Sequence, residues 1–256
     1  MTRAAAALAV TGGIAWSLCA AAMVGGAPPA ADAAGRAVVM LTGSHGTFCS
    51  GVALARDLVL TAAHCVLPGA DYKLVEPGRA GQQPLLRDIA RIARHPEFDV
   101  NAVLRHRVTA DVALLRLAAA RDVVPASLAP AGGTIAAGDR FVVAGYGLTV
   151  RGDGRTGGTV RAATLVATGQ PGTLQVRLAD PDTKGERAGL GACTGDSGAP
   201  VYRDVGGTLA VVGVVSWSTG PALSEGCGGL TGVTPLARYR AWIVEQAGKL
   251  GSPIAP

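Results

Sequence analysis

Residues 195–200 read Gly195-Asp196-Ser197-Gly198-Ala199-Pro200, which places a serine in a short glycine-rich turn. Two other stretches carry a histidine and an aspartate, Thr61-Ala62-Ala63-His64-Cys65 and Asp111-Val112-Ala113-Leu114-Leu115. A serine hydroxyl is a weak nucleophile at neutral pH, so it needs a base that removes its proton and a third group that orients the base. Histidine suits the base because its unperturbed pKa lies near the working range. Together the three stretches predict a nucleophile, a base and an orienting carboxylate.

The order of these groups along the chain is informative, because unrelated proteins that use the same three groups carry them in different orders. Here the order is His, Asp, Ser, and the flanks are Leu58-Val59-Leu60-Thr61-Ala62-Ala63-His64-Cys65 and Val211 to Trp217. This combination resembles the chymotrypsin/trypsin family of serine proteases. The resemblance implies that His64 is the general base, Asp111 its orienting partner and Ser197 the nucleophile.

The rest of the chain has the composition and pattern of a β protein. Its 256 residues are 49% hydrophobic and include 37 glycines, and short valine-rich runs alternate with turns rich in Gly, Pro and Asp. This pattern is typical of an all-β sandwich or barrel. The resemblance covers the chain after residue 22 and implies two six-stranded antiparallel β-barrels, divided near residues 120–135, with the active site in the cleft between them. The helical spacing of apolar residues after Thr234-Pro235 predicts one C-terminal helix that starts there.

The charge of the chain bears on its partners. Charged residues make up 16% of the sequence, the formal net charge is +5, and the basic residues are scattered. Without a Lys/Arg cluster or interleaved aromatic and basic residues, nucleic acid is not an expected partner. The resemblance instead implies a peptide or protein substrate, a monomer, and no cofactor or metal. The preference for Arg and Ala over Lys suggests a GC-rich genome, so we expect a bacterial member of the family.

The first 22 residues differ from the rest of the chain. Arg3 supplies a basic start, apolar runs follow, and Ala20-Ala21-Ala22 offers the small residues of a cleavage site. This pattern predicts a secretory signal peptide at residues 1–22, a secreted protein, and a protease domain at residues 23–256 that no longer associates with a membrane. The alternative is an uncleaved anchor, because about 20 apolar residues can cross a bilayer. The small-residue ending favours cleavage.

The cysteines fit an exported protein. Five are present, and Cys19 would leave with the signal peptide. The remaining four indicate disulfides, but four cysteines allow three pairings, between which the sequence alone does not choose. A zinc site is the alternative, although the chain has no paired Cys-x-x-Cys or His spacing to support one. The family resemblance implies the pairs Cys49–Cys65 and Cys193–Cys227.

Backbone groups around the serine have an expected role of their own. The tetrahedral intermediate of the reaction carries an oxyanion that needs preformed N–H donors. The resemblance assigns this role to the N–H groups of Gly195 and Ser197. Glycine suits position 195 because the hole needs an unusual backbone conformation that a Cβ atom would oppose.

The resemblance also implies that a new N-terminus completes the site. Family members expose an Ile-Val-Gly-Gly-like sequence, and here Met23-Val24-Gly25-Gly26 directly follows the predicted cleavage site. We expect signal peptidase to free the amine of Met23, which then pairs with Asp196, since a buried charge must be paired. The alternatives are a chance Val-Gly-Gly in a glycine-rich chain and a cleavage after Arg36, which would leave too little chain before Cys49.

The expected specificity pocket has no acidic floor. The family resemblance implies that its floor lies six residues before the nucleophile, which is Gly191 here; trypsin-like members that cut after Arg or Lys have an Asp at that position. The expected pocket residues are Gly191, Ala192, Ser216, Trp217, Ser218, Thr231 and Gly232. Residues 219–234 can be aligned with the family pattern in two ways, which place different residues at the pocket wall. With Thr231 at the wall the pocket is narrow and takes small apolar side chains, whereas with Gly232 there it admits larger ones.

The sequence thus predicts a secreted serine endopeptidase that works through an acyl-enzyme and prefers small or apolar residues to Arg or Lys. Glu225 has two interpretations: a group at the pocket mouth that attracts basic residues, or a solvent-exposed loop charge. A second hypothesis is a catalytically idle homologue that serves as an extracellular binding module, although all three catalytic groups are retained. A third is an enzyme that acts mainly on esters, which shares the acyl-enzyme chemistry.

Overall fold

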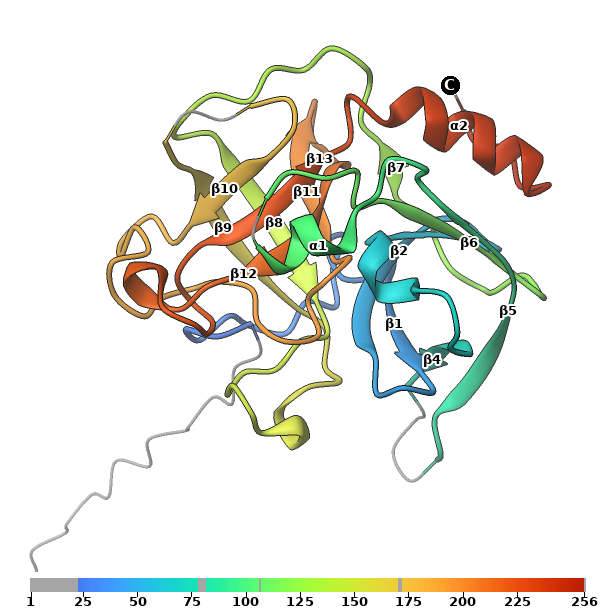
Figure 1. Ribbon diagram of the computed structural model, residues 1–256, viewed down its shortest axis with the longest axis horizontal. Helices are drawn as coiled ribbons and strands as arrows, with labels where there is room; N and C mark the ends of the chain where they lie inside the picture. The colour runs from blue at the N-terminus through green and yellow to red at the C-terminus, as the bar shows by residue number, and fades with distance from the viewer. Residues whose placement is uncertain (1–22, 78–81, 106, 170–171, 256) are drawn as a thin grey trace, which may run out of the picture.

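The computed structural model describes residues 23–77, 82–105, 107–169 and 172–255, and within them two β-barrels lie side by side (Figure 1). The predicted signal peptide lies outside the described residues. The first barrel closes in the order β1-β2-β3-β6-β5-β4. Its strands are β1 (Val38–Gly43), β2 (Phe48–Ala55), β3 (Leu58–Thr61), β4 (Tyr72–Glu76), β5 (Leu85–Arg94) and β6 (Ala113–Leu117). All its pairings are antiparallel.

The second barrel follows the order β11-β8-β9-β10-β13-β12 and closes through the β11–β12 pairing. Its strands are β8 (Arg140–Gly145), β9 (Arg161–Ala167), β10 (Val176–Ala179), β11 (Pro200–Val205), β12 (Thr208–Ser218) and β13 (Thr231–Pro235). A two-residue strand, β7 (Ser127–Leu128), lies on the connection between the barrels and adds to β12 in parallel. The predicted fold of two six-stranded antiparallel barrels is therefore confirmed.

Helical segments are few and short. The α-helices are α1 (Val100–Leu104) and α2 (Arg240–Lys249), and the 3-10 turns are η1 (Ala63–Val66), η2 (Gly154–Thr156) and η3 (Pro221–Leu223). The C-terminal helix was expected from Thr234-Pro235, and that boundary is wrong. Both residues belong to β13, where they pair with Val214 and Gly213 of β12, so the chain turns once more before α2 begins at Arg240. No helix among the described residues has the length and apolar character needed to cross a bilayer.

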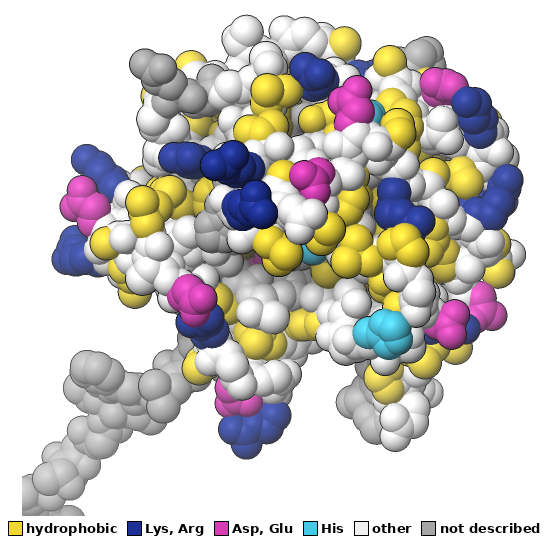
Figure 2. All heavy atoms as spheres, viewed as in Figure 1, with side chains coloured by type: hydrophobic (Ala, Val, Ile, Leu, Met, Phe, Trp, Pro, Cys, Tyr) yellow, Lys and Arg dark blue, Asp and Glu magenta, His cyan; other side chains and the backbone are white. Residues whose placement is uncertain are grey.

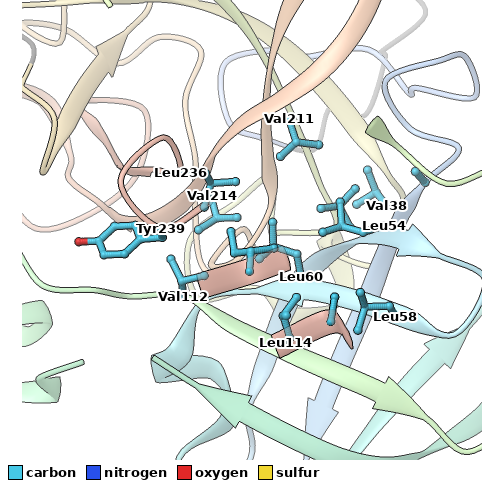
Figure 3. Packing of buried hydrophobic residues seen from close by; sticks show 14 of the residues in the cluster. Val38, Leu54, Leu58, Leu60, Val112, Leu114, Val211, Val214, Leu236 and Tyr239 are labelled. Carbon is cyan, nitrogen blue, oxygen red and sulfur yellow. The ribbon is translucent and has the colours of Figure 1, made fainter. Parts of the chain in front are cut away.

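Three buried clusters hold the fold together. One fills the first barrel, one fills the second, and the third lies between the barrels (Figure 3). Successive residues of a strand point to opposite faces, so one strand serves two clusters. In β3, Val59 packs inside the first barrel while Leu58 and Leu60 face the second one. In β12, Val214 packs between the barrels and Val215 inside the second. This double burial explains why these strands are apolar almost throughout.

The first and last described segments join the two barrels to each other. The first described residues run along the second barrel, where Val24 forms a bridge with Gly191 and Pro29 one with Arg161, before the chain enters the first barrel at β1. At the other end, α2 packs back onto the first barrel, and the rings of Tyr239 and Trp242 lie 5.0 and 4.8 Å from His95, measured between ring centroids.

Candidate active site

His64 and Asp111 come together because their strands are neighbours. His64 lies in η1, directly after β3, and Asp111 lies just before β6, which pairs with β3. Oδ2 of Asp111 lies 2.8 Å from Nδ1 of His64, and Oδ1 accepts the backbone N–H of the same residue at 2.9 Å. Two bonds from one carboxylate fix both the ring and its backbone. When Nδ1–H donates to the carboxylate, Nε2 is left as the basic nitrogen.

The carboxylate of Asp111 is fully buried and has a third partner. The hydroxyl of Ser216, in β12 of the second barrel, lies 2.5 Å from Oδ2. A buried carboxylate is tolerated only when hydrogen bonds replace its water, and here all three bonds come from the candidate site itself. The His64 side chain remains 19% exposed, so the ring is held on one side and open on the other.

Ser197 lies in the turn before β11, beside this pair. Its carbonyl accepts the backbone N–H of Ser50 at 2.8 Å. One sulfur atom, Sγ of Cys65, lies 3.8 Å from Nε2 of His64 and 3.6 Å from the carbonyl oxygen of Ser197. No hydrogen bond joins Nε2 to the Ser197 hydroxyl among the described residues. Hydrogen bonds of this kind are often long without substrate and tighten in the complex.

The turn that holds Ser197 has the backbone expected for an oxyanion hole. Gly195 has φ +97°, in the left-handed region that favours glycine, and a Cβ there would lie 2.3 Å from the Phe48 ring. Within the described part of the chain, neither the N–H of Gly195 nor that of Ser197 donates a hydrogen bond. Two donors in the same turn are thus left without an acceptor.

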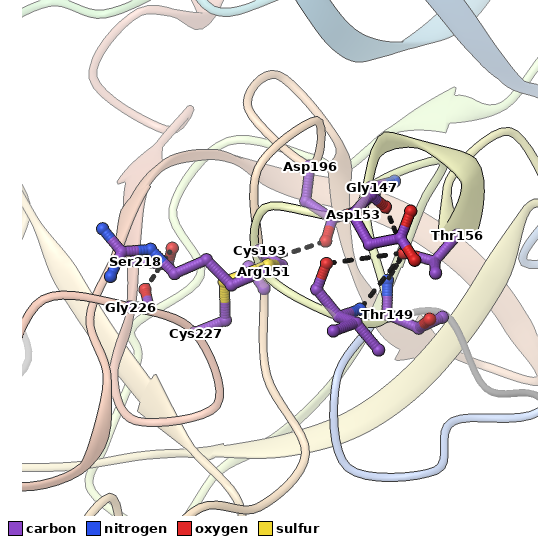
Figure 4. Close-up of a disulfide and its surroundings, with 12 residues drawn as sticks. Gly147, Thr149, Arg151, Asp153, Thr156, Cys193, Asp196, Ser218, Gly226 and Cys227 are labelled. Carbon is purple, nitrogen blue, oxygen red and sulfur yellow. Dashed lines mark hydrogen bonds between the residues drawn. A yellow bond between two sulfur atoms is a disulfide. The ribbon is translucent and has the colours of Figure 1, made fainter.

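Asp196 is a buried carboxylate without a counter-charge in the described residues. Its side chain is 0% exposed, and its oxygens accept the N–H groups of Gly147 and Cys193, each at 2.9 Å (Figure 4). Burial raises the pKa of Asp196 to about 7, and the two backbone hydrogen bonds offset only part of that effect. Met23 is also fully buried and packs in the cluster that contains Ala192.

The structure holds two disulfides, Cys49–Cys65 and Cys193–Cys227. The first joins β2 to η1, beside His64. The second joins the turn of Ser197 to the loop between β12 and β13 (Figure 4). The sulfurs of the first pair lie close to a ring nitrogen of His64. Because both are bonded to each other, neither is the thiolate that a zinc ion requires.

Thr231 and Gly232 point in opposite directions. The hydroxyl of Thr231, which is fully buried, accepts the N–H of Ala192 at 3.0 Å. A Cβ on Gly232 would instead lie 2.0 Å from the indole of Trp217. Thr231 therefore faces the 191–192 segment, and Gly232 provides the room that the Trp217 ring needs.

Two other residues of the expected pocket, Gly191 and Ser218, have contacts of their own. Gly191 lies against the backbone of Gly228, where an added Cβ would come within 3.0 Å of its Cα. Ser218 donates from its hydroxyl to the carbonyl of Gly226 at 3.3 Å (Figure 4). The side chain of Glu225 is 90% exposed and lies 3.2 Å from Arg151, as a solvent-exposed loop charge would.

Sequence reasoning did not single out Ser50. This fully buried serine donates its hydroxyl to the carbonyl of Gly195. The available signal was a small polar residue directly after Cys49 at the start of an apolar run. Its partner is 145 residues away, so no local motif connects the two.

Comparison of the sequence with known proteins shows the family to which the chain belongs. The sequence model of the family described as Trypsin matches residues 23–243. The chain belongs to the trypsin family. It is 30% identical over 223 residues to a vitellin-degrading protease of Bombyx mori, covering 81% of this chain and 78% of that protein. It is 29% identical over 216 residues to a trypsin of Phaedon cochleariae, covering 78% of each. Chymotrypsin-like elastase family member 1 of Rattus norvegicus is also 29% identical over 216 residues, with 76% of each covered.

Membership of the trypsin family makes this protein a serine endopeptidase, a hydrolase whose substrates are peptides or proteins. These trypsin-family relatives come from two insects and a rat, so the expectation of a bacterial source receives no support from them. On the face drawn in Figure 2, several basic side chains gather left of centre, whereas the other basic and the acidic ones are spread among hydrophobic and uncharged side chains.

Proposed function

We propose that this protein is a secreted endopeptidase in which Ser197 is the nucleophile, His64 the general base and Asp111 the group that orients the base. The observation that carries the proposal is the buried Asp111 carboxylate, bound to both the ring and the backbone of His64 beside the turn of Ser197. A carboxylate in this place holds the imidazole in one tautomer and stabilises its cation.

The proposed reaction has two halves. The hydroxyl oxygen of Ser197 attacks the peptide carbonyl while Nε2 of His64 takes its proton, and the carbonyl oxygen becomes an oxyanion. The free N–H groups of Gly195 and Ser197 are the proposed donors to this oxyanion; losing one such donor typically costs about 3–4 kcal/mol. His64 then gives its proton to the leaving amine as the C–N bond breaks. Water, activated by the same ring, hydrolyses the acyl-enzyme.

The proposed preference is for small or apolar residues before the cut bond. It is supported by Thr231, whose side chain occupies space next to Ala192, and by the absence of a carboxylate at positions 191 and 192. The names of the relatives do not decide the matter, since they include both a trypsin and an elastase-like protein.

The proposed mature chain begins at Met23, after removal of a signal peptide at residues 1–22. Three observations support this start: the small residues before it, the family match that begins at the same residue, and the burial of Met23 near the second barrel's core. Its new ammonium is the proposed partner of Asp196. Sequencing the first residues of the secreted protein tests the proposal; a start at Met23 supports it, and a start at Ala37 overturns it.

A fluorophosphonate probe tests the nucleophile, because it reacts with activated serines. We expect labelling of the secreted protein on Ser197 alone, found by peptide mapping. Ser197→Ala should abolish the labelling, and Ser44→Ala, at an exposed serine away from the turn, should leave it intact. Labelling that persists in Ser197→Ala, or an unlabelled wild-type protein, would contradict the proposed mechanism.

A further inference from the structure

One buried residue of the first barrel holds the turn that carries the proposed oxyanion donors. Ser50, in β2, is 0% exposed. Its hydroxyl donates to the carbonyl of Gly195 at 2.8 Å and accepts the N–H of Tyr146 at 2.9 Å. Its backbone N–H donates to the carbonyl of Ser197 at 2.8 Å. Both donor residues of the proposed oxyanion hole are thus bound, through their carbonyls, to the same serine.

These bonds fix two peptide planes. The peptide between Gly195 and Asp196 is held at its carbonyl by Ser50, and its N–H donates to Cys193 at 3.0 Å. The peptide between Ser197 and Gly198 is held at its carbonyl by Ser50, and its N–H donates to Val215 at 2.7 Å. A planar peptide that is bound at both ends cannot rotate without losing a hydrogen bond.

Fixing these planes matters most at Gly195. A glycine has more accessible backbone conformations than any other residue, and this one lies in the left-handed region. The N–H of Gly195 belongs to the preceding peptide, whose Thr194 carbonyl accepts the N–H of Leu148 at 2.8 Å. With Ser50 holding the peptide that follows, both peptides around Gly195 are bound, so rotation about the backbone bonds of this glycine is restricted and its N–H keeps one direction. Donors stabilise a transition state most when they are already aimed at the developing charge.

We propose that the Ser50 hydroxyl is a positioning group for the oxyanion hole, which orients the N–H of Gly195 by holding the carbonyl of the same residue. The inference rests on the proposed function of Gly195 and Ser197. The first barrel would then have two parts in the reaction. It supplies the general base, and through Ser50 it helps to stabilise the transition state. Ser50 does not touch the substrate; it acts through the backbone of Gly195.

The test is Ser50→Ala, which removes the hydroxyl but keeps the backbone bonds to Ser197 and Thr61. We expect kcat for a peptide amide to fall by about tenfold or more, part of the 10²- to 10³-fold cost of losing a donor outright. KM should change little. Inhibition by a peptide boronic acid, whose tetrahedral oxygen occupies the hole, should weaken by a similar factor, while binding of an uncleavable peptide should not.

The matched control is Thr61→Val. The Thr61 hydroxyl donates to the carbonyl of Ser50 at 2.7 Å in the same buried region, but it makes no bond to Gly195. This variant should lose comparable stability with kcat and boronic acid affinity unchanged. If both variants lose kcat equally, the effect is one of general stability and the proposal is overturned.

Rates are to be expressed per active site, with sites counted by complete fluorophosphonate labelling, so that misfolded protein does not contribute. If Ser50→Ala yields no folded protein, Ser50→Gly replaces it, because glycine keeps the backbone bonds. Wild-type kcat in either variant overturns the role of Ser50 while leaving the proposed function intact. Absent labelling of wild-type Ser197 overturns the proposed function itself.

Discussion

At the scale of single residues, the burial of Asp196 changes the protonation of its carboxyl group. The pKa of its carboxyl is raised by burial from 3.8 to about 7. Between these values the folded chain keeps a proton that the unfolded chain has lost. The stability that this proton contributes is therefore complete below about pH 4 and is lost as the pH rises through 7. The free energy of unfolding is therefore higher below pH 4 than above pH 7 by an amount on the order of 4 kcal/mol.

This linkage gives a prediction for a chain that is still extended ahead of Met23. Its free energy of unfolding should contain a falling component between pH 4 and 7, which Asp196→Asn removes. Urea unfolding of both proteins across this range, in a Ser197→Ala background that prevents self-digestion, measures the two slopes. The slopes are compared rather than the absolute stabilities, because the Asn amide cannot accept from both backbone donors. Parallel curves would show that Asp196 does not titrate there.

Thr231 gives a second prediction at this scale. Thr231→Gly removes the side chain that faces Ala192, so the pocket should admit larger groups. We expect kcat/KM for substrates with Leu or Phe before the cut bond to rise relative to Ala substrates, by about tenfold or more. A panel of chromogenic peptides measures the ratio. Thr234→Ala, in the same strand, serves as the control and should not change it; an unchanged ratio in Thr231→Gly refutes the pocket assignment.

At the scale of elements, the Cys193–Cys227 disulfide joins two loops that both border the candidate site. Its residues are 34 positions apart, so it closes a long loop in the unfolded chain. Replacing both cysteines by alanine should lower the free energy of unfolding by about 2–4 kcal/mol. Because the loop from Ser218 to Gly226 would also loosen, KM should rise more than kcat falls. Denaturant unfolding and steady-state kinetics measure the two effects; unchanged stability would contradict the cross-link's role.

The elements also show which features a sequence can reveal. The strands were predictable, because β3 and β12 are buried on both faces and leave continuous apolar runs. The start of α2 was not, since helical spacing says nothing about the pairing that holds Thr234 and Pro235 in β13. The Thr231/Gly232 ambiguity had a similar origin. The pairing of β12 with β13 shifts register between Val215 and Trp217, so that Trp217 lies opposite Gly232 and Ser218 opposite Thr231. An irregularity of one residue leaves no mark in the sequence pattern.

At the scale of the whole molecule, the groups of the candidate site come from both barrels: His64 and Asp111 from the first, and Ser197 and Ser216 from the second. His64 and Asp111 could be recognised from their flanking residues, because local motifs carry them. The contacts of Ser50 could not, because they depend on how the two barrels dock. The sequence therefore predicts the candidate residues themselves better than the contacts that hold them in place.

The N-terminal segment gives the prediction at this scale. A protein with extra residues fused before Met23 keeps the three proposed catalytic groups but cannot present a free ammonium to Asp196. Removing one partner of a buried ion pair costs about 3–5 kcal/mol, so kcat/KM should fall on the order of 100-fold or more. Steady-state kinetics of the fused protein, before and after a specific protease removes the extra residues, measures the loss and its recovery. Equal activity in both forms would refute the Met23–Asp196 pair.

Because the candidate site is shared between the two barrels, a chain that ends after the first barrel cannot form it. A transcript that ends in the connection between the barrels encodes the imidazole and its carboxylate but not the hydroxyl, which lies beyond β10. The Leu58 and Leu60 face of β3 would then lose its cover and meet water. Such a fragment would lack the proposed nucleophile and would expose an apolar surface, so we expect it to be inactive and prone to aggregate.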